Sequence, residues 1–202
     1  MISLGLTGVV LLSRIAGVCG IVSQLAGFVI LFLVISTSPW FRWTEDDISV
    51  LGIESPRKML FNYGLILVGG LSLLFAVGLG QSFLLGRIWW FGIASLMLGS
   101  LAVSAVGVFP RNFDLPHDLS TLAFFVFTAL AFLLIGVAAV SSSQMIFGVP
   151  SIVAGALIVI FQLVPWPWSG GAIPQLLSCL PWSLWTIAMG VRLLMSPVAI
   201  SV

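Results

Sequence analysis

The stretch FRWTEDDISVLGIESPRKMLFNYG, residues 41–64, holds more than half of the charge in a chain that is otherwise almost entirely apolar. The 202-residue sequence has only seven Lys or Arg and six Asp or Glu residues. Within this stretch lie Arg42, Glu45, Asp46, Asp47, Glu54, Arg57 and Lys58. Because long apolar runs precede and follow it, the stretch is predicted to be a water-exposed loop between two segments that cross a membrane.

The composition supports the same conclusion for the whole chain. Hydrophobic residues make up 60% of the sequence and charged residues 6%, whereas a soluble domain carries about 25% charged residues. The chain contains several runs of about 20 apolar residues, the length that crosses a bilayer core. They predict an all-α polytopic membrane protein, a six-transmembrane-helix bundle forming one domain over residues 1–202, with spans at about 15–36, 56–80, 88–109, 116–140, 150–164 and 174–194.

The fifth predicted span is shorter than the others and ends in the sequence Pro165-Trp-Pro-Trp168. A segment of this length either crosses the bilayer or forms a re-entrant or strongly tilted element. The sequence leaves both alternatives open.

Prolines mark where the spans begin and end. Ser55-Pro56 is typical of a helix start, with Pro at the first helical position. Pro110 is predicted to stop the third span and Pro116 to begin the fourth. Pro181 lies inside the sixth span, where it predicts a kink.

A short helix is predicted in the first loop, from about Glu45 to Leu51, on the membrane surface. Thr44 followed by Asp47 fits a helix-start pattern, with acidic residues beside the positive helix end. Gly52 suits a helix stop. Its apolar residues, Ile48 and Leu51, are expected to face the membrane.

An even number of spans places both termini on one side, which we call side A, and the first, third and fifth loops on the other, side B. Side A receives Arg14, Arg87 and Arg192. Side B receives Arg42, Glu45, Asp46, Asp47, Glu54, Arg57, Lys58, Arg111, Asp114, Asp118 and the single histidine, His117. Basic residues favour cytoplasmic loops, and those of side A are not mixed with acidic ones. We therefore expect side A to be cytoplasmic, in a multi-pass protein of the cell membrane.

Pairs of small residues four positions apart occur in three spans, and such pairs let helix backbones approach closely in lipid. We expect them to pack inside the bundle. The pairs are Ala16 with Gly20, Ser95 with Gly99, and Ser151 with Gly155.

The acidic run Glu45-Asp46-Asp47 is the first candidate for chemistry. Carboxylates are suitable ligands for a hard cation, but the run has no spaced ligand pattern. A solvated helix start is the favoured interpretation. Ion pairing with Arg42, Arg57 or Lys58 is the alternative.

His117 is the second candidate, between Asp114 and Asp118 at the start of the fourth span. A catalytic zinc site usually needs several histidines, so no metal is expected. Together with one of the aspartates, His117 could act as an acid/base pair of a lipid-modifying enzyme. The alternative role is a structural hydrogen bond at the start of the span. Neither a P-loop nor a dinucleotide fingerprint is present, and no cofactor is expected.

Polar residues inside the spans are the third candidate. They seek partners within the bundle, most often as hydrogen bonds between helices. This applies to Gln24, Asn62, Tyr63, Gln162 and Gln175. The functional alternative is a polar cavity that opens to side B and is lined by Asn62, Tyr63, His117 and Gln162.

A set of motifs resembles the DUF998 family, small and mostly prokaryotic integral membrane proteins of uncharacterised function. The resemblance covers about residues 40–125, and one position departs from it, because Val50 stands where the family often has an acidic residue. The motifs are Trp43, Thr44-Glu45, Ser49-Val-Leu-Gly52, Phe61-Asn-Tyr-Gly64, Gly107-Val-Phe-Pro110, His117 and Phe124-Phe125. The order is more distantly similar to that of the eukaryotic Frag1/DRAM/Sfk1 group. The resemblance implies six spans with the first loop packed against the end of the bundle.

These observations lead to a hypothesis for function. The polar cap formed by loops 37–58 and 110–120 is expected to bind a lipid headgroup or a partner protein, with Arg57, Lys58 and Arg111 meeting phosphate. A lipid-modifying enzyme is the alternative. A transporter or channel is disfavoured because no span carries a charge near its middle. A structural subunit or a homo-oligomer stays open, and the absence of a basic patch argues against nucleic acid.

Overall fold

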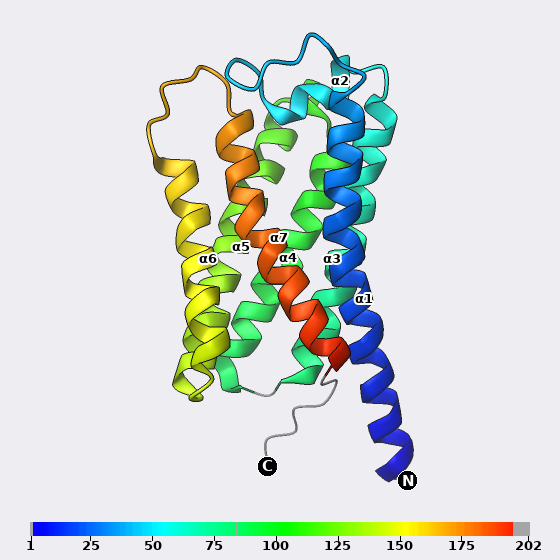
Figure 1. The fold of residues 1–202 in the computed structure, drawn as a ribbon, viewed down its shortest axis with the longest axis vertical. Helices are drawn as coiled ribbons and strands as arrows, with labels where there is room; N and C mark the ends of the chain where they lie inside the picture. Colours follow the sequence, from blue (N-terminus) through cyan, green and yellow to red (C-terminus); the bar gives the residue numbers. More distant parts are fainter. Residues whose placement is uncertain (1, 84, 196–202) are drawn as a thin grey trace.

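A computed structural model describes residues 2–83 and 85–195. Six long helices form the molecule, and short helices lie in the first and third loops (Figure 1). The long helices are α1 (Ile2–Ile35), α3 (Lys58–Ser82), α4 (Gly86–Val108), α5 (Leu115–Ser141), α6 (Met145–Leu163) and α7 (Ala172–Met195). The short ones are the 3-10 helix η1 (Ile48–Val50), α2 (Leu51–Glu54) and the 3-10 helix η2 (Arg111–Phe113). All six long helices are long and apolar enough to cross a membrane, so the predicted fold class is confirmed.

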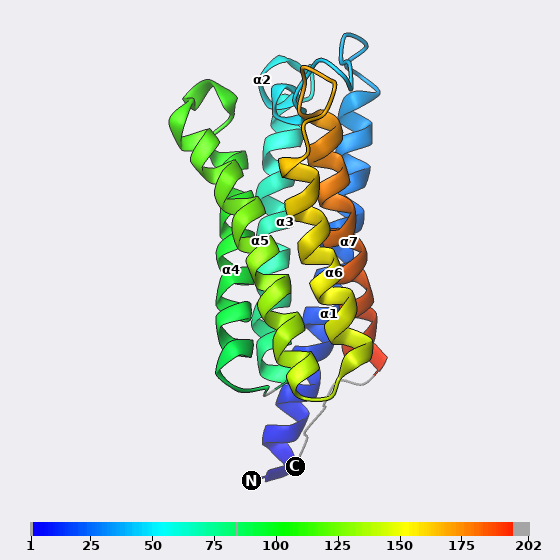
Figure 2. The ribbon, with the colours of Figure 1, turned by 90° about the vertical axis from the view of Figure 1, so that its left-hand side faces the viewer.

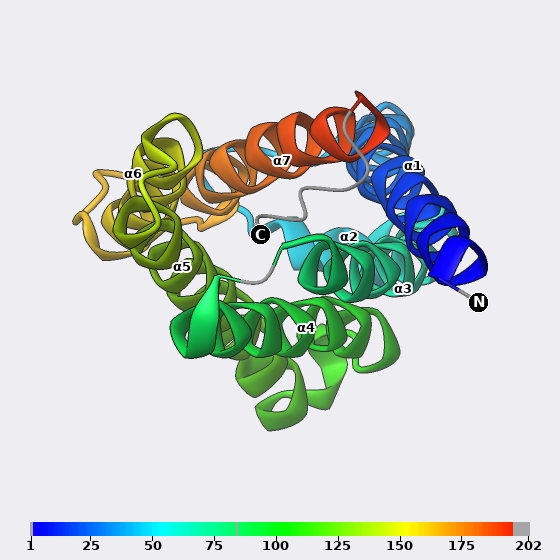
Figure 3. The ribbon, with the colours of Figure 1, turned by 90° about the horizontal axis from the view of Figure 1, so that it is seen from below.

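The six helices form a closed ring. Each long helix packs against its neighbours in the chain, and α1 also packs against α7, which closes the ring (Figure 3). Successive helices run in opposite directions, so the first, third and fifth loops lie at one end of the molecule. The beginning of α1 and the end of α7 lie at the other end (Figure 1).

The first helix is longer than its predicted span. It runs without a break from Ile2 to Ile35, because no proline interrupts it, and its candidate membrane segment begins at Val10. Arg14 lies 21 residues before Ile35, roughly 32 Å along the helix, which matches the ~30 Å thickness of a bilayer core. This separation fits the predicted start of the span next to Arg14.

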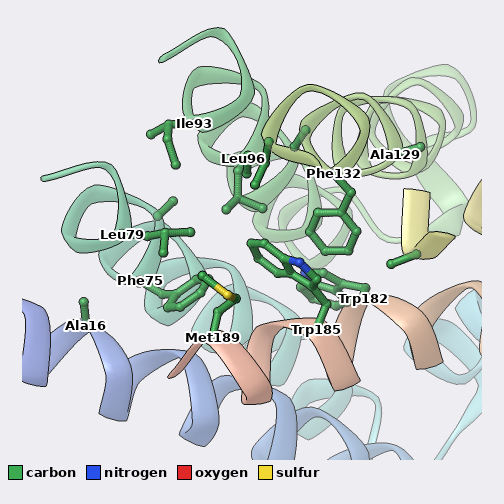
Figure 4. Packing of buried hydrophobic residues seen from close by; sticks show 14 of the residues in the cluster. Ala16, Phe75, Leu79, Ile93, Leu96, Ala129, Phe132, Trp182, Trp185 and Met189 are labelled. Atoms are coloured by element: carbon green, nitrogen blue, oxygen red, sulfur yellow. The ribbon is translucent and has the colours of Figure 1, made fainter. Parts of the chain in front are cut away.

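Aromatic rings fill the centre of the ring of helices (Figure 4). The Trp185 ring contacts those of Phe132 and Phe75, with centroid distances of 4.4 and 6.3 Å, and Phe124 contacts Trp182 at 5.0 Å. Phe75, Phe132 and Trp185 lie 13 to 17 residues from the side B ends of their helices, roughly 20–26 Å along them. This cluster fills the middle of the bundle, and the larger cavities lie between it and side B.

Glycines lie where helices approach most closely. A Cβ atom on Gly20 would meet the Phe75 ring at 2.6 Å, one on Gly99 would meet Thr128 Oγ1 at 2.8 Å, and one on Gly155 would meet the Ala129 carbonyl oxygen at 2.9 Å. These positions belong to the three predicted small-residue pairs, and their role in internal packing is confirmed.

The fifth span differs from its prediction. The helix α6 begins at Met145, five residues before Pro150, and has 19 residues. Its length of roughly 28 Å is enough to cross a bilayer core, and it is one of the six candidate membrane spans, which favours a crossing helix over a re-entrant segment. Pro150 lies inside the helix, in its second turn, and removes one backbone donor there, a loss that membrane helices tolerate where neighbouring groups satisfy the freed carbonyl.

The short helix in the first loop also differs from its prediction. It begins at Ile48 rather than Glu45 and continues through Gly52. Leu51 is fully buried, with Val34 and Phe61 in the same apolar cluster, and does not face the membrane. A Cβ atom on Gly52 would lie 2.5 Å from Asn62 Oδ1, so this glycine permits close packing and does not end the helix.

The start of the second span is likewise shifted, because α3 begins at Lys58 and not at Pro56. Instead of capping that helix, Ser55 is buried, and its Oγ accepts hydrogen bonds from Ser38 Oγ at 2.8 Å and from the Arg57 N–H at 3.2 Å. The expected stop at Pro110 and start at Pro116 are confirmed, and Pro181 lies inside α7.

Candidate functional site

Asp47 joins three loops at side B. Its Oδ1 accepts a hydrogen bond of 2.8 Å from the backbone N–H of Gly171 in the fifth loop. Its Oδ2 forms an ion pair with Arg111 of the third loop, and the same guanidinium nitrogen donates to Ser49 Oγ at 3.3 Å. One carboxylate thus ties the first, third and fifth loops into a single cap.

The backbone of the first loop adds to this junction. The N–H groups of Gly170 and Ala172 donate to the carbonyls of Thr44 and Asp46, at 3.1 and 3.0 Å. Gln175 in α7 accepts the N–H of Ile48 through Oε1 at 3.0 Å. These contacts hold residues 44–47 in turns, which explains why the short helix begins only after them.

The other acidic residues of the run have local partners. Glu45 forms an ion pair of 2.7 Å with Arg42, and the Arg42 N–H donates to Asp46 Oδ2 at 2.7 Å. Both side chains of the Glu45–Arg42 pair are about half exposed or more, and such pairs contribute about 0–1 kcal/mol. Asp47 is the N-cap residue of η1, as the helix-start interpretation predicts, but its carboxylate is bound by Gly171 and Arg111 and is not simply solvated. The ion-pairing alternative holds for Glu45.

His117 is buried and holds the start of α5 against the end of α4. Its Nδ1 lies 2.9 Å from the Phe109 carbonyl oxygen, so Nδ1–H is the donor, and Nε2 lies 3.5 Å from Thr121 Oγ1. Within the described residues, neither Asp114 nor Asp118 bonds to the imidazole. The structural interpretation of His117 therefore accounts for both ring nitrogens.

A cavity of about 590 Å³ opens between α5 and α6 below the cap. Its walls are apolar and its ceiling is polar. The walls include Leu122, Phe125, Val126, Ala129, Leu130, Leu133, Ile158, Val159 and Leu163, and the polar residues are Asp47, Ser49, Arg111, His117, Asp118, Thr121, Gln162 and Gln175. From Asp118 to Leu133 the lining follows 15 residues of helix, roughly 22 Å. We call this cavity the α5–α6 groove.

The groove exists because the two helices touch near side A and separate toward side B (Figure 2). Gly136 and Gly148 face each other, since a Cβ atom on either would lie within 3 Å of the carbonyl oxygen of the other. Gly155 makes the next close approach, to Ala129. Beyond Gly155 the side chains of α6 are larger, beginning with Ile158, and the helices no longer touch closely.

A second cavity of about 140 Å³ lies inside the ring of helices. It is lined mainly by apolar residues of α1, α3, α4, α5 and α7. Gln24 and Ser183 are buried polar residues on its wall, and Gln24 Oε1 accepts a hydrogen bond of 2.8 Å from Ser183 Oγ. The interior cavity and the groove share four lining residues, Ser49, Thr121, Phe125 and Gln175.

The predicted polar cavity is therefore only partly correct in its lining. His117 and Gln162 line the groove, whereas Asn62 and Tyr63 do not. Asn62 donates to the Gly52 carbonyl at 2.9 Å, and Tyr63 is 68% exposed. Both belong to α3, which packs against α1 and α4 and contributes nothing to the groove.

Only one of the three predicted phosphate-binding cations lies at the groove. Arg111 lines the groove, but Arg57 and Lys58 lie exposed at the start of α3 and line neither of the two cavities.

The interhelical role expected for the glutamines is present at Gln162, which donates to Ser178 Oγ of α7 at 2.9 Å. Within the described residues, no group of three or more His, Cys, Asp or Glu side chains is placed to hold a metal ion.

Sequence reasoning missed the central place of Asp47 and the contributions of Ser49 and Thr121 to the groove. The available signal was the pair Gly170-Gly171 in the fifth loop. A Cβ atom on Gly171 would lie 2.6 Å from Asp47 Oδ1, so a glycine is needed for the carboxylate to reach the backbone. Two adjacent glycines predict close backbone approach, but not the partner that approaches.

Comparison with known proteins agrees with this architecture. The family described as "Protein of unknown function (DUF998)" matches residues 18–192, a range that contains about half of α1 and most of α7. No curated protein matches the chain, and no solved structure matches it. The match extends the resemblance seen in residues 40–125 to all six candidate spans. The protein is therefore a member of the DUF998 family, with six helices that could span a membrane.

Proposed function

We propose that this protein binds one membrane phospholipid, with an acyl chain in the α5–α6 groove and the headgroup beneath the side B cap. The observation that carries the proposal is the distribution of polarity in the groove. Its walls are formed by Leu, Val and Ile side chains, and its ceiling by charged and amide side chains. A phospholipid has the same division between an apolar chain and a polar end.

The dimensions of the groove suit a lipid of one leaflet. The lining follows α5 for roughly 22 Å, and one leaflet of a bilayer contributes about 15 Å of hydrocarbon, half of ~30 Å. Leu122, Val126 and Leu130 on its wall are 61%, 50% and 40% exposed. The groove is therefore open sideways to lipid, and its ligand would enter from the membrane.

Arg111 is the residue that would hold the phosphate. Its pair with Asp47 and its bond to Ser49 both use Nη1. A guanidinium has five N–H donors and can bind phosphate in a bidentate way, so donors are left for a headgroup. Arg57 and Lys58, which lie outside the groove, are not part of this site.

The enzyme alternative has less support. His117 and Asp118 both line the groove, which favours it, but within the described residues neither Asp114 nor Asp118 bonds to the imidazole, so the expected acid/base pair is not formed. Transport has less support as well, because Phe75, Phe132 and Trp185 fill the centre of the ring. Lipid binding uses both the groove and the cap without further assumptions.

The proposal includes an orientation in the cell membrane, with side A in the cytoplasm. Arg14, Arg87 and Arg192 lie at side A, away from every acidic side chain of the chain. The test is a single added cysteine in the exposed loop residue Ser142 or in Thr44, labelled from outside intact cells. Labelling of Thr44→Cys alone supports the orientation, and labelling of Ser142→Cys alone contradicts it.

Lipid binding can be tested by filling the groove. Val126→Trp places a large ring on the groove wall, whereas Val137→Trp places the same ring on an exposed position of the same helix outside the groove. Native mass spectrometry of the protein extracted from membranes should show much less bound phospholipid for Val126→Trp than for wild type or Val137→Trp. Equal lipid retention by the two variants would contradict the proposal.

A further inference from the structure

We infer that the headgroup bound under the cap carries a primary ammonium group beside its phosphate, as in an aminophospholipid. This inference rests on the proposed lipid site and specifies its ligand. It is drawn from the charges that line the α5–α6 groove and from the groups that already satisfy them.

The charge of the groove is the first step. Its lining contains one cation, Arg111, and two carboxylates, Asp47 and Asp118, which gives a formal charge of −1 with neutral His117. A phospholipid of net negative charge would add to this excess beside a low-dielectric wall, where charges interact strongly. A zwitterionic headgroup adds no net charge and brings a cation that can meet the unpaired carboxylate.

The two carboxylates are not equivalent. Both oxygens of Asp47 have partners, Gly171 and Arg111. The Asp118 carboxylate has no hydrogen bond or ion pair within the described residues, although its backbone N–H bonds to the Asp114 carbonyl at 3.0 Å. Asp118 lies in the first turn of α5, where the helix dipole favours a negative charge. The dipole does not occupy the carboxylate oxygens, which stay available to a ligand.

Arg111 and Asp118 are held on one corner of the molecule. The Asp114 N–H donates to the Arg111 carbonyl at 3.1 Å, and the next bond runs from Asp118 to Asp114. Both side chains line the groove. A cation and a free carboxylate on the same rim provide complementary charges for a phosphate and an ammonium of one headgroup.

The kind of ammonium follows from the other lining groups. A quaternary ammonium is recognised by a cage of aromatic rings, and Phe125 is the one aromatic side chain among the described residues of the groove. A primary ammonium instead has three N–H donors and needs acceptors. Asp118 supplies carboxylate oxygens, and Gln162, whose amide nitrogen donates to Ser178, presents an Oε1 that accepts no hydrogen bond from the described residues.

The test compares three lipids with identical acyl chains, phosphatidylethanolamine, phosphatidylcholine and phosphatidylglycerol, added in equal amounts to the delipidated full-length protein. Native mass spectrometry should show a preference for phosphatidylethanolamine of about fivefold, near the upper limit for one partly exposed ion pair. Asp118→Asn should reduce this preference to nearly none while still binding lipid. The control Glu54→Gln, at an exposed side B carboxylate outside the groove, should keep it.

Each outcome separates the inference from the proposal on which it rests. The ammonium assignment is overturned if the wild type binds the three lipids equally, or if its preference survives Asp118→Asn. In either case the lipid site itself stands as long as Val126→Trp still loses lipid. Lipid binding that Val126→Trp does not reduce overturns the site itself. Unchanged thermal unfolding of Asp118→Asn and Glu54→Gln, both exposed substitutions, shows that the comparison is made between folded proteins.

Discussion

Asp47 and Gly171 lie 124 residues apart in the chain, and the carboxylate of the first accepts the backbone N–H of the second at 2.8 Å. Because the other oxygen of Asp47 pairs with Arg111, this contact closes the cap over the α5–α6 groove. The glycine also contributes to this contact, since a Cβ atom at position 171 would lie 2.6 Å from Asp47 Oδ1 and force the carboxylate to shift.

Removing Asp47 should therefore loosen all three loops. Asp47→Ala is expected to destabilise the protein by about 2–3 kcal/mol, because it leaves a backbone donor and a guanidinium without their partner. Asp47→Asn keeps the acceptor for Gly171 and should lose about half as much. Thermal unfolding in detergent measures both changes. Glu45→Ala is the control and should shift stability by less than ~1 kcal/mol, since its pair with Arg42 is exposed.

Two adjacent glycines in α3 give a matched test of the helix packing. A Cβ atom on Gly69 would meet Ser104 Oγ and the Ser100 carbonyl oxygen of α4, whereas one on Gly70 has open space. Gly69→Ala should destabilise the protein by about 1–3 kcal/mol through overpacking. Gly70→Ala should be neutral or stabilising by up to ~1 kcal/mol, because alanine is the better helix former. Similar unfolding temperatures for the two variants would contradict the packing of α3 against α4.

Asp114 has a backbone conformation that favours glycine. Its φ is +48° and its ψ is −106°, just before α5 begins. A residue with a Cβ atom is strained there by about 1–3 kcal/mol, and glycine is not. Asp114→Gly is therefore expected to raise the stability measured by thermal unfolding, or at least to preserve it. A clear loss of stability would show that the Asp114 side chain has a role that the hydrogen bonds do not reveal.

His117 separates the lipid-binding account from the enzyme account. His117→Ala removes the bond to the Phe109 carbonyl and should lower stability by about 1–2 kcal/mol while bound lipid is retained. His117→Asn places an amide N–H near the position of Nδ1 and should recover part of the loss. Mass analysis of the bound lipid before and after incubation provides the second readout. Chemical change of the lipid by wild type but not by His117→Asn would favour the enzyme.

The number of spans and most of their limits could be predicted from the sequence, because apolar length and proline positions are local properties. Pro110 and Pro116 mark the third loop as expected. The start of α6 was missed because a proline near the start of a helix, such as Pro150, does not have to be its first residue. The resemblance in residues 40–125 was enough to identify the family.

The cap and the groove could be predicted only in part, because both depend on contacts between distant segments. The sequence indicates that His117, Arg111 and Gln162 lie near one end, but not that Asp47 binds Arg111 and the fifth loop. It also assigns Asn62 to the same cavity, although the order of helices around the ring places α3 away from α5 and α6. The groove begins where the close glycine contacts of α6 end, and its depth depends on how α5 and α6 pack along their whole length.

The most direct measurement of the central claim is a density map of the protein in a lipid bilayer. The account predicts continuous density for an acyl chain between Val126 of α5 and Val159 of α6, leading to a headgroup beside Arg111. Density that shows α5 and α6 packed together along their full length, or a groove filled by protein side chains with lipid bound elsewhere, would contradict it.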